Sequence, residues 1–469
     1  MLDDVIEEIG EHLVVQVVTD NASAYKAAGT LLMEKRKHLY WTPCAAYCID
    51  LMLERIGELP QHATALSKAK KLSKYIYNHQ LVLDMMRKFA KRDIVRPAAT
   101  RFATAFLTLQ SIYQVRQPLE AMFTSEEWIE CPWAAKPDGK EARKTVLKDK
   151  NFWPSVIYAI RTTSPLVEVL RLVDGDKEPA MGFLYNAMDK AKEKIANNLG
   201  GEEKDYKEIW EIIDEKWEFQ LHRHLHAAAY YLNPRCHYAE DFSNHPEVKL
   251  GLFHCMDRLI PDPKEREKAD LQCSIFHNKE GFFGFTQAKQ TFEKRSPVDW
   301  WTQYGDGTPE LQKFAIKVLG LTCSASGCER NWSTFNQVHT KKRNRLTTQR
   351  MHSLVYIMFN KRLKDRYLRL ASPPSNEDDA LLLDDLPSDD EWIIGDNENE
   401  NVQRLSDKEL ERLELTQLNQ NHTSAPESSS RAGKRQRLVV DIDEDEWKDI
   451  DGGNEGGGDE DGDDEFEDF

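Results

Sequence analysis

The stretch VVQVVTDNASAYKAAGTLLMEKRKHLYWTPCAAYCIDL, residues 14–51, decides the fold class of this protein. Residues 14–18 are almost all β-branched, which predicts a short buried strand. Residues 22–35 predict a helix, 38–42 predict a second short strand, and another helix follows Pro43. Strand, helix, strand and helix in this order predict two parallel strands that lie side by side. The rest of the sequence shows no other clear strand.

Most of the chain beyond this stretch has the pattern of helices. From residue 61 to about residue 295, apolar residues recur at helical spacing, with Pro and Gly in the connecting segments. A loop at 296–310 precedes two further apolar stripes. The first stripe consists of Leu311, Phe314, Ala315, Val318 and Leu319, and the second of Met351, Leu354, Val355, Met358 and Phe359. The sequence therefore predicts a mainly α protein with a small α/β part.

Charge is spread unevenly along the chain, whose formal net charge is −17. Residues 371–469 hold 32 acidic and 8 basic side chains, a net charge of −24, so the rest of the chain has a net charge of +7. The acidic segment has too few apolar residues to fold alone, and we expect it to be a disordered tail. The mildly basic remainder is the part that suits a polyanionic partner.

Three features bear on the compartment. The opening residues, MLDDVIEEIGEH, lack the apolar run of a secretory signal, and no stretch approaches the ~18 apolar residues of a membrane span. We therefore expect an intracellular, reducing compartment, no membrane partner, and eight cysteines that are mostly buried thiols. The basic island RAGKRQR at 431–437 is typical of a nuclear-import patch, which predicts a nuclear protein.

Two acidic residues are candidates for chemistry. Asp20 directly follows the first predicted strand, where it either caps the next helix or serves as a metal-binding carboxylate. The second interpretation needs several carboxylates that converge on the same site. Glu329 lies on a predicted helix, either as a surface residue or as a second carboxylate of that site. The small residues 324–327 before it permit a close approach to another backbone.

Two further groups have weaker patterns. His222 and His226 lie four residues apart on a predicted helix, but their apolar neighbours favour packing, so we assign no metal ligands from sequence. A basic run either contacts phosphates or forms a solvated face between the two apolar stripes. This run consists of Lys341, Lys342, Arg343 and Arg345.

Six motifs, taken in order, resemble the plant branch of the hAT transposase superfamily over about residues 5–365. They are VVTDNASAYKAAGTLL, WTPCAAYCIDLML, TRFATAFLTL, LHAAAYYLNP, WWTQYG and LTCSASGCERNWSTF. The resemblance implies an RNase H-like domain interrupted by a large α-helical insertion, with a C-terminal dimerisation region. It also implies DNA cleavage by an Asp, Asp, Glu triad that holds two Mg²⁺ or Mn²⁺ ions.

The resemblance assigns roles to four residues. Asp20 matches the second carboxylate of the triad and Glu329 matches the third. Arg101 and Phe102 match an arginine–aromatic pair that, in the family, contacts DNA near the cut. An aromatic ring at that position can stack on an unpaired base.

The sequence departs from the family pattern in two ways. The strand that carries the first catalytic Asp, and the zinc finger that reads transposon ends, precede the segment with which this chain begins. We therefore expect an N-terminally truncated protein without cleavage activity and without a cofactor, in which Asp20 and Glu329 are vestigial. In addition, Tyr47 stands where the family has a His, and a phenol cannot move protons near neutral pH as an imidazole can.

These observations predict four regions. They are a truncated RNase H-like front half at 1–60, an α-helical insertion at 61–295, a dimerisation and closing segment at 296–370, and the acidic tail at 371–469. The expected function is that of a domesticated or degenerate transposase relative that self-associates and binds DNA. The expected dimer contacts are Leu311, Phe314, Val318, Leu319, Trp332, Met351, Val355 and Phe359, although the same residues could form only the core of one chain. The alternatives are an active or accessory nuclease and a DNA-binding transcriptional regulator.

Overall fold

A computed structural model describes residues 2–96, 102–175, 178–243, 245–338 and 346–371. The chain divides into two units, Met1–Asn399 and Glu400–Phe469, and every described residue belongs to the first. The predicted acidic tail therefore lies outside the described residues, apart from its first position. The basic island at 431–437 lies outside them as well.

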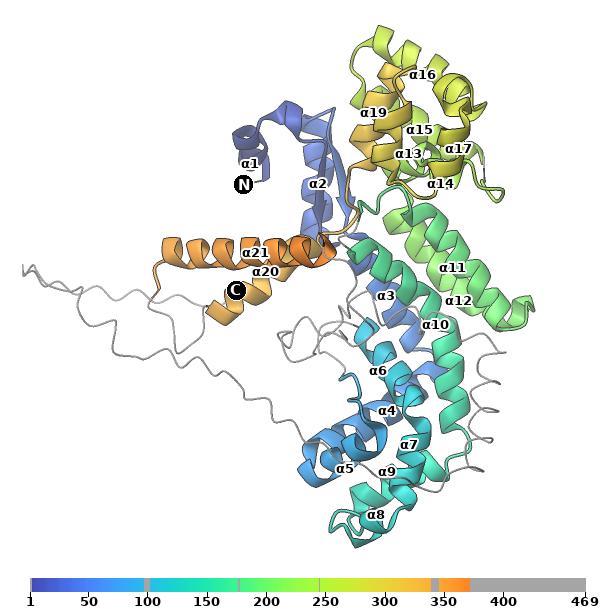
Figure 1. Cartoon of the computed structure of the whole chain (residues 1–469), viewed down its shortest axis with the longest axis vertical. Helices are drawn as coiled ribbons and strands as arrows, with labels where there is room; N and C mark the ends of the chain where they lie inside the picture. Colours follow the sequence, from blue (N-terminus) through green and yellow to red (C-terminus); the bar gives the residue numbers. More distant parts are fainter. Residues whose placement is uncertain (1, 97–101, 176–177, 244, 339–345, 372–469) are drawn as a thin grey trace, which may run out of the picture. The chain divides into compact units, whose positions relative to one another are not determined.

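Helices dominate the described residues, and two short strands accompany them (Figure 1). The strands are β1 (Gln16–Thr19) and β2 (Tyr40–Pro43). The helices of the first half are α1 (Leu2–Ile9), α2 (Ser23–Lys35), α3 (Ala45–Gly57), α4 (Pro60–Asn78), α5 (Gln80–Ala90), α6 (Ala103–Gln114), α7 (Arg116–Thr124), α8 (Glu126–Glu130), α9 (Pro137–Leu147), α10 (Phe152–Asp174), α11 (Leu184–Asn198) and α12 (Glu203–Lys216). Those that follow are α13 (His224–Leu232), α14 (Pro234–His237), α15 (Pro246–Leu259), α16 (Pro263–His277), α17 (Thr286–Thr291), α18 (Pro297–Tyr304), α19 (Pro309–Leu319), α20 (Ser326–Val338) and α21 (Thr348–Ala371). Three single turns complete the set: η1 (Glu11–Leu13), the π-helical η2 (Trp217–Leu221) and η3 (Gly281–Gly284).

The two strands form the small sheet that the sequence predicts. β1 and β2 are parallel neighbours, with Gln16 opposite Tyr40 and Thr19 opposite Pro43. Side chains on successive residues of a strand point to opposite faces. Val17 accordingly packs with α1 and α2, and Val18 packs against the main core. The prediction of a mainly α protein with a small α/β part is confirmed.

Acidic residues near the start of the chain fix α1 against the end of α2. The guanidinium of Arg36 is buried, and it donates from Nε to Asp3 Oδ1 at 2.8 Å and from Nη2 to Glu7 Oε1 at 3.0 Å. A third carboxylate, that of Glu11, lies 2.7 Å from Nη1. A buried guanidinium needs such partners, because burying an unpaired charge is costly. Hydrogen bonds from Lys35 and Arg36 hold the pKa of Asp3 below its usual range.

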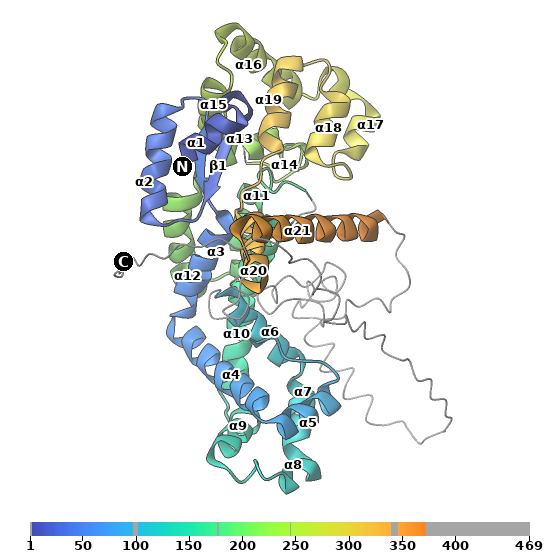
Figure 2. The same ribbon diagram turned by 90° about the vertical axis from the view of Figure 1, so that its left-hand side faces the viewer.

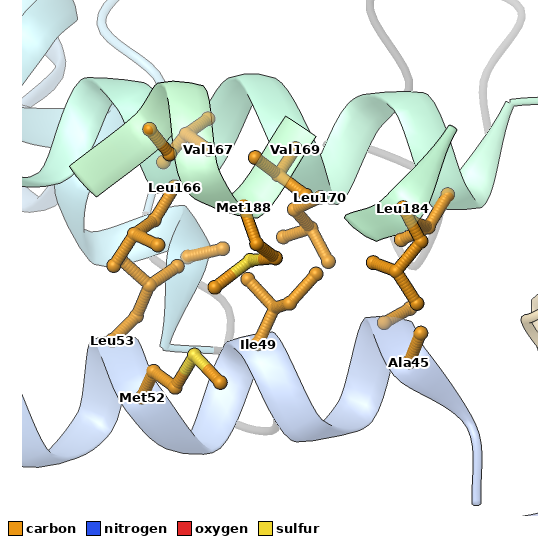
Figure 3. Close-up of a cluster of buried hydrophobic side chains, with 14 of the residues drawn as sticks. Ala45, Ile49, Met52, Leu53, Leu166, Val167, Val169, Leu170, Leu184 and Met188 are labelled. Atoms are coloured by element: carbon orange, nitrogen blue, oxygen red, sulfur yellow. The ribbon is translucent and has the colours of Figure 1, made fainter. Parts of the chain in front are cut away.

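The helix that follows β2 lies in the main core. α3 is apolar around much of its circumference, which is typical of a helix that is covered on several sides. Figure 3 shows Ile49 and Leu53 of α3 facing Leu166 and Leu170 of α10, with Met188 of α11 between the two helices. Because α3 begins where β2 ends, this packing fixes the sheet end relative to the helical part.

A proline inside α10 is accommodated by a side chain of the next helix. Pro165 has no N–H, so it cannot form the helical bond to the carbonyl of Arg161. Nδ2 of Asn198, at the end of α11, donates to that carbonyl oxygen at 2.8 Å. The carbonyl oxygen of Arg161 therefore has a hydrogen-bond partner, and α10 continues past Pro165 as one helix of 23 residues.

Arg258 of α15 connects the helical part to the α2–β2 loop. Its guanidinium donates to the carbonyl oxygens of Leu39 and Met33 at 2.8 Å and of Arg36 at 3.3 Å. The last carbonyls of a helix lack intrahelical partners, and a basic side chain is a favourable partner for them. The small α/β part is thereby joined to a helix more than two hundred residues further along the chain.

Candidate functional site

Asp20 lies where β1 ends, half-buried, two residues before the N-cap of α2. Its Oδ1 accepts a hydrogen bond from the N–H of Ala22 at 3.0 Å, which shapes the turn between strand and helix. No side chain caps the first turn of α2, so Asp20 orders the approach to the helix and does not cap it. The next residue, Asn21, is buried, and its Oδ1 has no hydrogen-bond partner among the described residues.

Cys44 joins the strand end to a distant turn. Its N–H donates to the carbonyl of Thr19 at 2.7 Å, while its Sγ accepts from the N–H of Ala325 at 3.2 Å. The N–H of Ala45 donates to the carbonyl of Cys323 at 2.8 Å. Backbones meet this closely because the turn before α20 consists of small residues, as the sequence predicts. Ser324 Oγ accepts from the N–H of Ser326 at 3.1 Å and holds that turn in shape.

These contacts bring the segments of both candidate carboxylates to one place. Asp20 is adjacent to Thr19, and Glu329 lies one helical turn beyond Ala325. Thr19 and Ala325 are both bonded to Cys44. Glu329 is half-buried in the first turn of α20, where the helix dipole favours a negative charge. Figures 1 and 2 show the start of α20 next to the start of α3.

Tyr47 and Asp50 form the neighbouring face of α3. Burial, together with the negative charge of nearby Asp20, raises the pKa of Tyr47, so its phenol stays protonated at neutral pH. Asp50, one turn further along, accepts hydrogen bonds from the N–H of Ala103 at 2.9 Å and of Phe102 at 3.2 Å. This carboxylate holds the first turn of α6, so that Phe102 lies near the same face of α3.

Sequence reasoning missed Asp50. The one available signal is its position as the first acidic residue on the otherwise apolar start of α3, AAYCIDL. Phe102 is itself exposed. Its predicted companion Arg101 lies outside the described residues, and so do Lys341, Lys342, Arg343 and Arg345. Their roles stay predictions.

The described residues do not fit the two-metal centre that the family resemblance implies. Within them, no three side chains of His, Cys, Asp or Glu form a group that could hold a metal ion. Asp20 has one carboxylate oxygen bonded to Ala22. Three of the acids that precede Asp20, namely Asp3, Glu7 and Glu11, surround Arg36 instead.

The first apolar stripe belongs to the core of this chain. The four expected dimer contacts on α19, Leu311, Phe314, Val318 and Leu319, are all fully or almost fully buried. A side chain without exposed area cannot contact a second copy unless the helix leaves the core. α16 and α18 pack against α19. Of the two alternatives left open by the sequence, the core of one chain describes these four residues here, and a dimer contact through them stays a prediction.

The second stripe is divided between packing and surface. Val355 is buried on the same face of α21 as Arg362, whose Nη1 donates to Thr334 Oγ1 of α20 at 3.1 Å. Val355 therefore packs within the helix pair, and its role as a dimer contact stays a prediction. Met351 and Phe359 are half-buried. Trp332 of α20, also an expected dimer contact, is 63% exposed.

Sequence reasoning missed two of the most exposed apolar residues of this pair. Tyr356 is 70% exposed and Ile357 is 60% exposed, and both lie on α21. With Trp332, Leu354 and Leu363, they make up what we call the α20–α21 surface. Contiguous apolar patches mark interaction sites, and Leu354 and Ile357, three residues apart on α21, are neighbours on its surface.

Comparisons with known proteins identify two segments of the chain. Residues 1–72 match a family described as a domain of unknown function, DUF659. Residues 280–360 match the hAT family C-terminal dimerisation region. No curated protein matches the chain. The second match places the chain in the class of transposase-related proteins that associate through a C-terminal segment.

The two matches support an hAT-family transposase-like protein, and the second also supports self-association. The matched dimerisation region includes α18 to α20 and the first half of α21. Among the described helices, none combines the length and the apolar character that a bilayer crossing requires.

Proposed function

We propose that this protein is a catalytically inactive hAT transposase relative that forms dimers through the α20–α21 surface and associates with DNA in the nucleus. The observation that carries the proposal is the exposure of Trp332, Tyr356 and Ile357 within a region matched as a dimerisation segment. A second copy of the chain is the partner that would cover these side chains.

The packing of α21 explains why this surface is available. Val355 and Arg362 turn one face of the helix toward α20. Leu354 and Ile357, three residues apart, lie on a neighbouring face and stay exposed. Burying a large aliphatic side chain contributes roughly 1.5–3 kcal/mol, which offsets the entropic cost of association when several such residues of each chain are buried together.

Sedimentation of the full chain tests the dimer. We expect wild-type protein to form a discrete dimer at micromolar concentration. Ile357→Asp should weaken association at least about tenfold, because it removes an anchor and places a charge in the interface. Gln349→Asp adds the same charge to the exposed first turn of α21 and should leave association unchanged. A wild-type monomer, or equal dimerisation of both variants, would refute this interface.

Loss of cleavage activity rests on the surroundings of Asp20. A third carboxylate would be needed beside Asp20 and Glu329, and three of the acids before Asp20, namely Asp3, Glu7 and Glu11, are engaged with Arg36. The residue facing Asp20 on α3 is Tyr47, whose raised pKa keeps it from acting as a base near neutral pH. These observations support an inactive protein.

The cleavage assay uses the full chain with Mg²⁺ or Mn²⁺ and hairpin or nicked duplex DNA. We expect no cleavage above that of a sample without protein. Cleavage that disappears in Asp20→Ala, and persists in the α2 surface variant Glu34→Ala, would show that Asp20 belongs to a working site. That outcome would favour the active or accessory nuclease.

A further inference from the structure

The net positive charge of residues 1–370 is concentrated on two helices that are far apart in sequence. Residues 60–78 and 136–150 together hold ten basic and three acidic side chains, a net charge of +7. Residues 1–370 as a whole also have a net charge of +7. The residues outside these two ranges therefore carry no net charge. The first range is α4, and the second is α9 with its flanking residues. Figures 1 and 2 show the two helices side by side.

A polar groove lies between these helices. Its volume is about 540 Å³, and Lys68 and Lys71 of α4 line it together with Lys144 of α9. Hydroxyl groups of Thr64, Ser67 and Thr145 also line it, and so do the carboxylates of Glu141 and Asp149. Hydroxyls and ammonium groups are donors, and phosphate oxygens accept from both.

Most of the surrounding ammonium groups have no acidic partner. Lys68 forms an ion pair with Asp149, and Nζ of Lys71 lies 3.6 Å from Oε1 of Glu141. Seven others form no ion pair with any described residue: Lys70, Lys74, Lys136, Lys140, Lys144, Lys148 and Lys150. All seven are exposed. Lys74 continues the helical row of Lys71, and Lys148 continues that of Lys144, so the charge extends along both walls of the groove.

We propose that these lysines, which we call the α4–α9 surface, bind the phosphate backbone of duplex DNA. Lysine is a flexible point charge that attracts phosphates without reading bases. Proteins that bind single strands add aromatic side chains on which bases stack. None of the large apolar side chains exposed in the described part of the chain lies on α4 or α9. The surface therefore suits a duplex, whose bases are already stacked.

This inference deepens the proposed function, on which it rests, by placing DNA contact on α4 and α9. The expected DNA-binding residues from sequence reasoning were Phe102, Arg101 and the run at 341–345. The α4–α9 surface is a separate and larger source of positive charge. It escaped sequence reasoning because its two halves are separated by nearly sixty residues and neither half is a dense basic run.

Salt titration of full-length variants tests the surface. Binding of a short mixed-sequence duplex is measured between about 50 and 200 mM salt, where each phosphate contact adds about 0.9 to the slope of log affinity against log salt. The triple variant Lys74→Gln, Lys144→Gln and Lys148→Gln should bind about tenfold or more weakly at the low-salt end, with a slope smaller by about 2 to 3. The matched control is Lys249→Gln, Lys289→Gln and Lys294→Gln, which removes the same charge from exposed lysines elsewhere in the chain.

The outcomes separate this inference from the proposed function. A smaller slope in the triple variant, with near wild-type binding by the control, supports the α4–α9 surface. Equal losses in both variants would show a general charge effect and overturn it, while DNA association itself would stand. Absence of DNA binding by wild-type protein would overturn both proposals.

Lysine protection gives a second measurement that does not depend on variants. An amine-reactive reagent is applied with and without the duplex, and modified peptides are identified by mass spectrometry. We expect Lys74, Lys144 and Lys148 to react in free protein and to be protected by duplex, more strongly than by an equal length of single strand. If their reactivity is the same with and without duplex, the proposal is wrong.

Discussion

At the scale of single residues, Asp50 shows how one carboxylate positions a candidate DNA contact. It sits on α3, yet both of its oxygens accept hydrogen bonds from the first turn of α6. The first amides of a helix lack intrahelical partners, so a carboxylate at this point satisfies them and complements the helix dipole. The location of Phe102 therefore depends on a residue fifty positions earlier.

Asp50→Ala should lower the free energy of unfolding by about 1 kcal/mol, the usual cost of losing a helix cap. Hydrogen exchange at the amides of Phe102 and Ala103 should become faster, because these amides lose their acceptor. Asp50→Asn retains an acceptor oxygen and should cost less. Glu54→Ala, one turn along the same helix, is the control. Unchanged exchange at Phe102 and Ala103 in Asp50→Ala would contradict this role.

At the scale of elements, α2 packs on β2 through a glycine. A Cβ built on Gly29 would lie 2.3 Å from Cγ and Cδ2 of Trp41, which is far too close. The indole is buried, and its Nε1 donates to Thr19 Oγ1 of β1 at 3.0 Å. The close approach of α2 to β2 thus fixes the position of the Trp41 indole, and the hydrogen bond of this indole links β2 to β1. Sequence periodicity alone gives no indication of this requirement.

Gly29→Ala should therefore destabilise the protein, although Ala favours helices over Gly by about 1 kcal/mol. We expect a loss of roughly 1–3 kcal/mol from overpacking, with a changed Trp fluorescence because the indole must move. Ala27→Gly, on the exposed part of α2, should lose about 1 kcal/mol through helix propensity alone and leave the fluorescence unchanged. A gain of stability in Gly29→Ala, measured by urea unfolding, would refute the packing argument.

At the scale of the whole molecule, buried histidines couple stability to pH. Burial lowers the pKa of His62 and of His226 to about 4 and that of His237 to about 3. In the unfolded chain each has a pKa near 6.5, so below that pH the unfolded state binds more protons. Their contribution to stability is complete above pH 6.5 and is lost as pH falls toward 4. Burial of Asp189 raises its pKa to about 6 and acts in the opposite direction.

Between pH 7 and pH 5, three histidines outweigh one aspartate, since each group changes stability by at most about 1.4 kcal/mol per pH unit. We expect the free energy of unfolding to fall by roughly 2–4 kcal/mol over this range, measured from urea unfolding curves. His226→Gln should reduce the pH dependence, while the exposed His12→Gln should not. Constant stability between pH 7 and pH 5 would contradict the assignment of these three groups.

The sequence by itself determined the local order of this protein. Strand, helix, strand and helix over residues 14–58 follow from side-chain periodicity, and the parallel pairing follows from a helix placed between two short strands. The run of small residues before Glu329 likewise indicated a close backbone contact. The backbone hydrogen bond from the N–H of Ala45 to the carbonyl of Cys323 is such a contact. Local pattern is sufficient in these cases because the deciding interactions lie within one or two elements.

Only the tertiary structure decided which apolar faces are covered and which charges gather. The stripes on α19 and α21 have the same spacing, yet one is buried in the core and the other leaves Tyr356 and Ile357 exposed. The hydrophobic effect is non-directional, so a stripe shows that a helix face will be buried but not by what. The lysines of α4 and α9 become one surface only because packing in the core sets the two helices side by side. Coulomb forces depend on distance in space, which the order of residues along the chain does not give.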